Sequence, residues 1–110
     1  MSKTEKLNDL LREELAAAVN REAPLPEALI TITYVKCSPD LEQAQIGFSI
    51  LPDRLAGTAL RHLTASTGRL AATVGKRLKL RKMPHFSWEF DATEKDADFI
   101  GRLVDEANSL

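Results

Sequence analysis

The sequence predicts an α+β domain in which helices cover one face of a three-stranded sheet. Residues 28–37 and 43–50 alternate apolar and polar side chains as strands do, and residues 86–91 do so with aromatic ones. Apolar residues recur at helical spacing in residues 3–21 and in two stripes between residues 53 and 78. This order of helices and strands is typical of a two-layer α+β sandwich.

The first expected element is an amphipathic helix over residues 3–21. Its apolar positions fall at i, i+3, i+4, i+8 and i+11 and are Leu7, Leu10, Leu11, Leu15 and Ala18. Pro24 and Pro26 follow this segment, and proline cannot continue the helical hydrogen bonding. The helix is therefore expected to end before Pro24.

A β-hairpin is expected next. Residues 28–37 are rich in Ile, Thr, Tyr and Val, and Ser38-Pro39-Asp40 has the composition of a tight turn. The short connection makes the following strand antiparallel to the first. Strict alternation places Tyr34 on the same face as Ile30 and Ile32, which predicts a position in the core.

Two helical stripes follow Pro52-Asp53. They consist of Leu55, Ala56, Ala59 and Leu63, and then of Leu70, Ala71, Val74 and Leu78. Between them, residues 65–68 combine small polar residues with a glycine, which predicts a break or sharp kink and a second helix beginning near Gly68.

The aromatic segment after Pro84 predicts a third strand. Trp88 alternates with polar neighbours, so a core position is favoured over a platform for stacking RNA bases. Thr93 is expected to start a last helix with its apolar side on Ala97, Ile100, Val104 and Ala107.

Charge is distributed unevenly along the chain. The whole sequence has 15 basic and 16 acidic residues, but residues 54–88 contain no Asp or Glu. The eight basic residues of this stretch are Arg54, Arg61, Arg69, Lys76, Arg77, Lys79, Arg81 and Lys82. A one-sided positive surface attracts polyanions, so nucleic acid is the first hypothesis for the partner.

Helical spacing predicts that these cations face solvent. Arg54 and Arg61 lie opposite one apolar stripe, and Arg69 and Lys76, with Lys79 near them, lie opposite the next. A merely solvated face is the alternative, although such a face usually mixes charge signs. At the expected break, Ser66 and Gly68 would let a phosphate approach a helix N-terminus, and a plain helix–helix corner is the alternative there.

Catalysis and metal binding have little support. His62 and His85 are the only histidines and Cys37 is the only cysteine, and no pair of them has the spacing of a structural metal site. We therefore expect no catalytic residue, no metal and no cofactor. Cys37 is expected to pack as a small apolar side chain.

Bulk properties predict one cytoplasmic domain that is a monomer without membrane association. The chain has 110 residues and cannot form an intrachain disulfide with one cysteine. It contains no run near the roughly 20 apolar residues that span a bilayer. Its first 20 residues lack the apolar core of a signal peptide.

Residues 31–44 resemble the T-x-T-x-V-x-x-S-x-D-L-x-x-A signature of the ribosome-binding factor A family. Gly68, the Leu78-x-Leu80-Arg81 element, Pro84 and the aromatic strand ending at Asp91 follow in the same register. The resemblance covers nearly the whole chain. It implies a type II KH-like fold with the order α-β-β-α-kink-α-β plus a C-terminal helix.

The family differs from ordinary KH domains at the phosphate-clamping loop. It replaces the GxxG of that loop with an Ala-x-Gly kink, which reads Ser66-Thr67-Gly68 in this chain. No GxxG occurs anywhere in the sequence, which argues against a general single-strand KH binder.

Known members of the family bind the small ribosomal subunit and its rRNA during late maturation and have no catalytic site. The resemblance implies that residues 1–110 form one KH-like ribosome-binding domain that acts in ribosome biogenesis and rRNA processing, with ribosomal proteins as further candidate partners. The expected rRNA contacts are Arg54, Arg61, Ser66, Gly68, Arg69, Lys76, Lys79, Arg81 and Lys82. Two alternatives stay open, namely a protein–protein adaptor with a basic face and a general KH-type RNA-binding domain.

Overall fold

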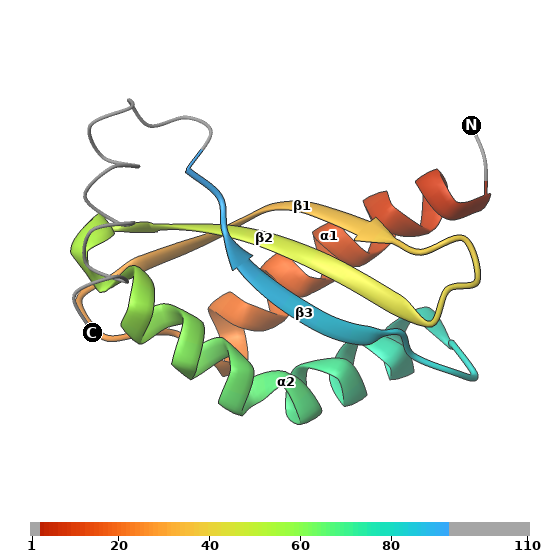
Figure 1. Cartoon of the computed structure of the whole chain (residues 1–110). Helices are drawn as coiled ribbons and strands as arrows, with labels where there is room; N and C mark the ends of the chain where they lie inside the picture. The colour runs from red at the N-terminus through yellow and green to blue at the C-terminus, as the bar shows by residue number, and fades with distance from the viewer. Residues whose placement is uncertain (1–2, 93–110) are drawn as a thin grey trace.

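Two helices and three strands alternate in the part of the chain that the structure, a computed structural model, describes, which is residues 3–92 (Figure 1). The elements are α1 (Lys3–Glu22), β1 (Leu29–Cys37), β2 (Gln43–Leu51), the short 3-10 helix η1 (Asp53–Leu55), α2 (Ala56–Leu78) and β3 (His85–Phe90). The helix expected from Thr93 onward lies outside the described residues. The predicted helix at residues 3–21 and the three predicted strands are confirmed.

The sheet has the order β1-β2-β3 and mixes both kinds of pairing. β1 and β2 form the predicted antiparallel hairpin, while β2 and β3 run parallel because the chain crosses over through α2 between them. In the hairpin turn, the Ser38 hydroxyl donates a hydrogen bond to Asp40 Oδ1 at 2.6 Å. The same carboxylate accepts a hydrogen bond from the Glu42 N–H, so the turn is closed by its own side chains.

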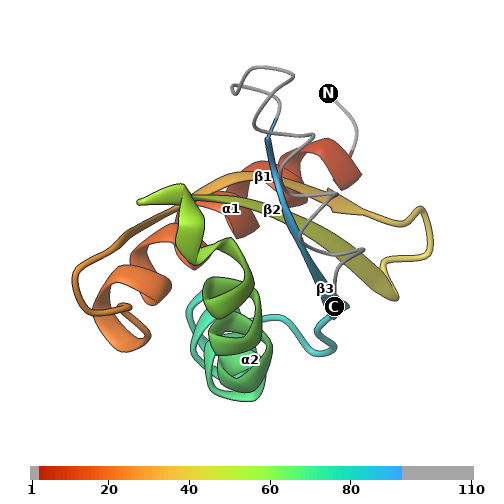
Figure 2. The same ribbon diagram turned by 60° about the vertical axis from the view of Figure 1, so that its left-hand side comes forward.

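Both helices pack on the same face of the sheet, as Figures 1 and 2 show together. Leu11 and Leu15 of α1 and Leu63 and Leu70 of α2 are fully buried, and they join Phe48 of β2 in one apolar core. The predicted α+β sandwich with helices on one face is therefore confirmed. Leu10, which was expected on the buried side of α1, is 39% exposed because it lies at the edge of that side.

A register shift between Ile32 and Tyr34 reverses the expected orientation of Tyr34. Ile30 and Ile32 are buried on the helix side, and Val35 takes the next buried position after the shift. Tyr34 pairs with Gly47 on the opposite face, where its ring fills the space that a Cβ atom at Gly47 would need. The prediction of a core position for Tyr34 is wrong because one extra residue in a strand changes the face of the next side chain.

α2 is one continuous helix, so the second helix predicted to begin near Gly68 does not form, whereas the kink predicted as the other possibility is present as a bend. Thr64 and Thr67 donate hydroxyl hydrogen bonds to the carbonyls of Leu60 and Leu63, at 2.7 and 2.9 Å. Such bonds to the preceding turn slightly destabilise a helix and often bend it. Both views show the ribbon of α2 changing direction near its middle, so the chain bends here without breaking (Figures 1 and 2).

Trp88 joins β3 to the middle of α2. Its ring is 9% exposed, and its Nε1–H donates a hydrogen bond to Thr67 Oγ1 at 2.8 Å. The predicted core position of Trp88 is confirmed. The hydrogen bond satisfies the polar end of a buried indole and holds the sheet against the bend of the helix.

Candidate nucleic-acid interface

All eight basic residues of the acid-free stretch are exposed, as helical spacing predicted. Two of them have acidic partners, since Arg77 contacts Glu14 of α1 at 2.6 Å and Lys82 contacts Glu42 at 3.5 Å. Within residues 3–92, the other six form no ion pair within 4.0 Å. These six are Arg54, Arg61, Arg69, Lys76, Lys79 and Arg81, and we call them the unpaired cations.

Three of the unpaired cations, Arg61, Arg69 and Lys76, lie on the exposed side of α2, while Arg54 directly precedes the helix and Lys79 and Arg81 follow it. The opposite side of the helix is buried through Ala59, Leu63, Leu70 and Val74. Successive cations at positions 54, 61, 69 and 76 are seven or eight residues apart, which corresponds to steps of about 10–12 Å along a helix. An elongated polyanion could therefore contact several of them at once.

Helix stability does not explain the cations near the start of α2. The N-terminal end of a helix carries a partial positive charge, so basic residues there are unfavourable. Arg54 lies in η1 directly before α2, Arg61 lies in its second turn, and no acidic residue occupies its first turn. Lys76 and Arg77 in the last turn do suit the helix dipole, so the dipole explains only the C-terminal part of the charge.

Ser66 and Gly68 occupy opposite sides of α2. Ser66 is 6% exposed and faces the core, whereas Gly68 is exposed. Because the helix continues through both, the helix N-terminus expected near Gly68 is not formed and presents no free N–H groups. Gly68 therefore lies on the same surface as the unpaired cations, and the side chain of Ser66 does not.

The C-terminal end of α2 places Lys79 on an unusual backbone. Lys79 has φ 56° and ψ 42°, the left-handed conformation that glycine usually supplies at a helix end. The N–H of Leu80 donates to the carbonyl of Gly75 at 3.0 Å, which closes the helix end. A lysine in this conformation costs about 1–2 kcal/mol more than a residue with right-handed geometry.

Aromatic rings do not accompany the unpaired cations in the described residues. Phe48, Phe86 and Trp88 are buried, and Phe90 packs against the core. Tyr34 is half-buried on the opposite face of the sheet, where its hydroxyl donates a hydrogen bond to Glu89. Burial first, and then this bond and the charge of Glu89, raise the pKa of Tyr34. The surface therefore suits phosphate contact better than base stacking.

His62 and Cys37 have surroundings that indicate structural roles. His62 Nε2 lies 2.8 Å from the carbonyl oxygen of Ala23, which joins α2 to the end of α1. Burial raises the pKa of the Cys37 thiol, which favours its unreactive protonated form. No group of three or more His, Cys, Asp or Glu side chains within residues 3–92 could hold a metal ion.

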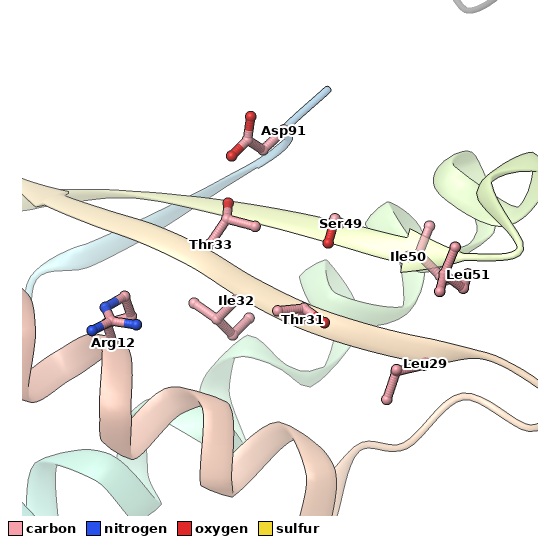
Figure 3. A pocket seen from close by; sticks show the side chains of 9 residues that line it. All are labelled: Arg12, Leu29, Thr31, Ile32, Thr33, Ser49, Ile50, Leu51 and Asp91. Atoms are coloured by element: carbon pink, nitrogen blue, oxygen red, sulfur yellow. The ribbon is translucent and has the colours of Figure 1, made fainter. Parts of the chain in front are cut away.

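A pocket lies along the first half of β1 and the end of β2 (Figure 3). Its lining residues are Arg12, Leu29, Thr31, Ile32, Thr33, Ser49, Ile50, Leu51 and Asp91. None of the unpaired cations is among them. The pocket and the cationic side of α2 are therefore two distinct surfaces.

No helix in residues 3–92 combines the length and apolarity that a bilayer crossing requires. The mixed three-stranded sheet with two helices on one face defines an α+β class of domain. The type II KH-like fold expected from the sequence is confirmed by the comparisons with solved structures that follow.

The family model of ribosome-binding factor A matches residues 3–104, and the chain belongs to this family. A ribosome-binding factor A from Stutzerimonas stutzeri is 33% identical over 112 residues, which cover 96% of this chain and 86% of the relative. One from Thioalkalivibrio sulfidiphilus is 30% identical over 109 residues, covering 96% and 84%. The family resemblance stated from residues 31–44 is therefore confirmed.

Two structural neighbours come from Thermus thermophilus. The crystal structure of its ribosome-binding factor A has a TM-score of 0.72 at 24% identity and covers 80% of this chain and 96% of its own. A homology model of the same factor, fitted into a cryo-EM map of a 30S complex, has a TM-score of 0.71 at 23% identity, with 82% and 97% covered. At these identities the likeness establishes the fold.

Sequence reasoning missed three features of this surface. The partners of Arg77 and Lys82 are Glu14 and Glu42, which lie far away along the chain, so no local pattern indicates them. For the left-handed backbone at Lys79, the sequence offers one indication, which is that the apolar helical stripe ends at Leu78. No glycine follows to mark the helix end in the usual way.

Proposed function

We propose that this protein binds the small ribosomal subunit through rRNA phosphates and assists late maturation of the subunit, including rRNA processing. The observation that carries the proposal is the row of unpaired cations along the exposed side of α2. Membership of the ribosome-binding factor A family and the 30S complex of the Thermus thermophilus factor support the choice of partner.

The proposed contacts are electrostatic and depend little on base identity. The unpaired cations would neutralise phosphates, and Gly68 would lie between them where the backbone of the RNA passes. Ser66 is left out of the contact surface because its side chain is buried. Lys82 is included as a weaker contact because Glu42 already balances its charge.

Charge reversal tests the proposed surface. Arg69→Glu with Lys76→Glu should abolish most co-sedimentation with small subunits at low salt, because each reversal replaces an attraction to phosphate by a repulsion. Both side chains are exposed, so the melting temperature should change little. In the wild type, the slope of log affinity against log salt should be near −3 for about four phosphates of unpaired RNA, and more negative for duplex RNA.

A matched control reverses two exposed cations elsewhere. Arg12→Glu with Lys36→Glu makes the same change in net charge, but Arg12 lies on α1 and Lys36 lies on the sheet face away from the helices. This variant should keep most of its binding. Equal losses in both variants would show that only net charge matters and would reject α2 as the contact surface.

Ribonuclease treatment and free oligonucleotides separate the two alternative functions. An adaptor that docks on a protein would stay with its partner after the rRNA is digested. A general KH-type RNA-binding domain would bind short single strands as well as it binds subunits. Salt-sensitive binding that prefers small subunits and is lost after digestion is the result that we expect.

A further inference from the structure

Two exposed leucines lie opposite each other at the end of the sheet where β2 leads into α2. Leu29 starts β1 and Leu51 ends β2, and the two are directly paired in the β1–β2 register. Their exposed fractions, 56% and 57%, are the largest among the exposed large apolar side chains of residues 3–92. Their neighbours Ile30 and Ile50 are buried, so the leucines belong to the sheet face away from the helices. We call them the Leu29–Leu51 pair.

The pocket of Figure 3 combines this apolar pair with polar groups that have no partner in the described residues. Arg12 of α1 lines the pocket and forms no ion pair within 4.0 Å in residues 3–92. The hydroxyl oxygen of Thr33, also in the lining, is buried and has no hydrogen-bond partner there. A buried polar group without a partner is unfavourable. The pocket therefore suits an occupant that brings apolar side chains and acidic groups.

The part of the chain that the structure describes ends beside this pocket. Asp91 lines it, and the N–H of Asp91 donates a hydrogen bond to the carbonyl of Phe48 at 2.7 Å, so the chain leaves β3 alongside the last residues of β2. Residues 93–110 follow in the sequence. A segment tethered so closely reaches the pocket at a high effective concentration, about millimolar for a short flexible linker.

The sequence of residues 93–110 complements the pocket in both respects. Ile100, Leu103, Val104 and Ala107 recur at the spacing of one helix face. The segment contains five acidic and two basic residues, which gives it a net charge of −3 and a sign opposite to that of Arg12. An isolated helix of this length is marginal in water and becomes stable when its apolar side packs on a surface.

We propose that residues 93–110 form an amphipathic helix that docks on the Leu29–Leu51 pair, with acidic residues of the segment facing Arg12. This docking covers part of the sheet face away from the helices. The unpaired cations of α2 are not part of it, so the inference does not rest on the proposed function.

Hydrogen–deuterium exchange of the full chain, followed by mass spectrometry, tests the docking. Amides of residues 97–107 should exchange roughly tenfold or more slowly than in an unstructured chain, as expected for a segment docked most of the time. Leu29→Thr with Leu51→Thr should abolish this protection. Threonine suits a strand, so protection of α1 and α2 should remain and show that the variant is folded.

A matched control removes two exposed leucines elsewhere. Leu10 and Leu60 are 39% and 38% exposed and lie on α1 and α2. Leu10→Gln with Leu60→Gln should leave the exchange of residues 97–107 as it is in the wild type.

The reciprocal variant changes the segment and leaves the sheet intact. Ile100→Asp with Val104→Asp should abolish protection of residues 97–107 and lower the melting temperature. Adding Leu29→Thr and Leu51→Thr to this variant should lower the melting temperature less than it does in the wild type, because the shared contact is already lost.

Wild-type exchange of residues 97–107 at the rate of an unstructured chain would overturn the inference. Protection that survives Leu29→Thr with Leu51→Thr would overturn it too. Protection that falls on dilution would show that a second copy of the chain occupies the pair, and would reject intramolecular docking. Small-subunit binding should be unchanged by the leucine substitutions. A wild type that does not bind small subunits would overturn the proposed function and leave this inference standing.

Discussion

The sheet face away from the helices and the exposed side of α2 both carry polar residues, but they differ in whether their charged groups have partners within the protein. On the sheet face, Glu89 accepts hydrogen bonds from the Tyr34 hydroxyl and the Gln45 amide. The ammonium group of Lys36 lies 5.1 Å from the centroid of the Tyr34 ring. Charges on this face are therefore balanced by neighbours within the protein.

The exposed side of α2 has no such balance. The six unpaired cations on this side and next to the two ends of α2 face solvent, and none forms an ion pair within residues 3–92. Exposure alone does not distinguish the two surfaces, because both contain exposed side chains. What distinguishes them is whether the protein itself supplies the counter-charge: it does so on the sheet face, and within residues 3–92 it does not do so for the unpaired cations.

Glycine to alanine substitutions should have opposite effects in the two regions, and this is the largest effect that we expect. A Cβ atom at Gly47 would overlap the ring of Tyr34 across the sheet. Gly47→Ala should therefore lower the free energy of unfolding by about 1–3 kcal/mol, through displacement of the ring. At Gly68 the same change should be stabilising.

Chemical denaturation of Gly47→Ala, measured beside the double variant Gly47→Ala with Tyr34→Ala, tests this mechanism. Removal of the ring should recover most of the stability that the added methyl group lost. Equal stability of the single and double variants would show that the ring is not the obstacle.

Substitutions at the neighbours Lys76 and Arg77 should have effects of intermediate size. They compare an unpaired cation with a paired one in the same turn of α2. Lys76 is unpaired, whereas Arg77 is held by Glu14 at 2.6 Å. Lys76→Gln should weaken binding to small subunits and make the salt slope shallower by about 0.7–0.9. Arg77→Gln should change binding less and lower stability by about 0–1 kcal/mol, because exposed ion pairs contribute little.

Affinity measured at several salt concentrations distinguishes these two variants, which carry the same change in net charge. Equal changes in the salt slope would mean that Arg77 contacts the partner as Lys76 does, in spite of its ion pair with Glu14. The distinction between paired and unpaired cations would then not predict binding.

The smallest effect concerns the alkaline titration of Tyr34. The chain contains one tyrosine, and the indole of Trp88 does not titrate, so the change in near-ultraviolet absorbance at alkaline pH follows Tyr34. Burial and Glu89 raise its pKa, so it should ionise above the ordinary value of about 10. The neutral form is favoured in the fold, and the associated stability is present below pH of about 10 and is lost as pH rises toward the folded-state pKa.

Glu89→Gln removes a nearby negative charge and should bring the titration of Tyr34 closer to the ordinary value. Binding to small subunits at neutral pH should not change, since Glu89 lies on the other face of the sheet. A titration that is identical in both proteins would contradict the role assigned to Glu89.

The sequence predicted the layers of the fold because they depend on local periodicity. Leu11 and Leu15 at helical spacing, and Ile46 and Phe48 at strand spacing, are all fully buried. Tyr34 could not be placed correctly, because a register shift in β1 has no signature in the alternating pattern. Near Gly68 the expected kink is present as a bend, to which the threonine hydroxyl bonds contribute, but the second helix expected to begin there did not form because α2 continues through residues 65–68.

The candidate surface was predictable to a similar extent. The absence of acid between residues 54 and 88 indicated a cationic side, and helical spacing correctly placed its cations in solvent. The pairing of Arg77 and Lys82 with distant glutamates depends on the tertiary structure. The burial of Ser66 depends on the continuity of α2, which local composition did not indicate.

The hydrogen bond between Trp88 and Thr67 gives this protein an internal optical reporter. Trp88 is the only tryptophan of the chain, and its indole N–H donates a hydrogen bond to Thr67, the residue directly before Gly68. A change in the bend of α2 would alter the surroundings of this indole, and hence the wavelength and intensity of its emission. Movement of the helix on a partner can therefore be followed in the unlabelled protein.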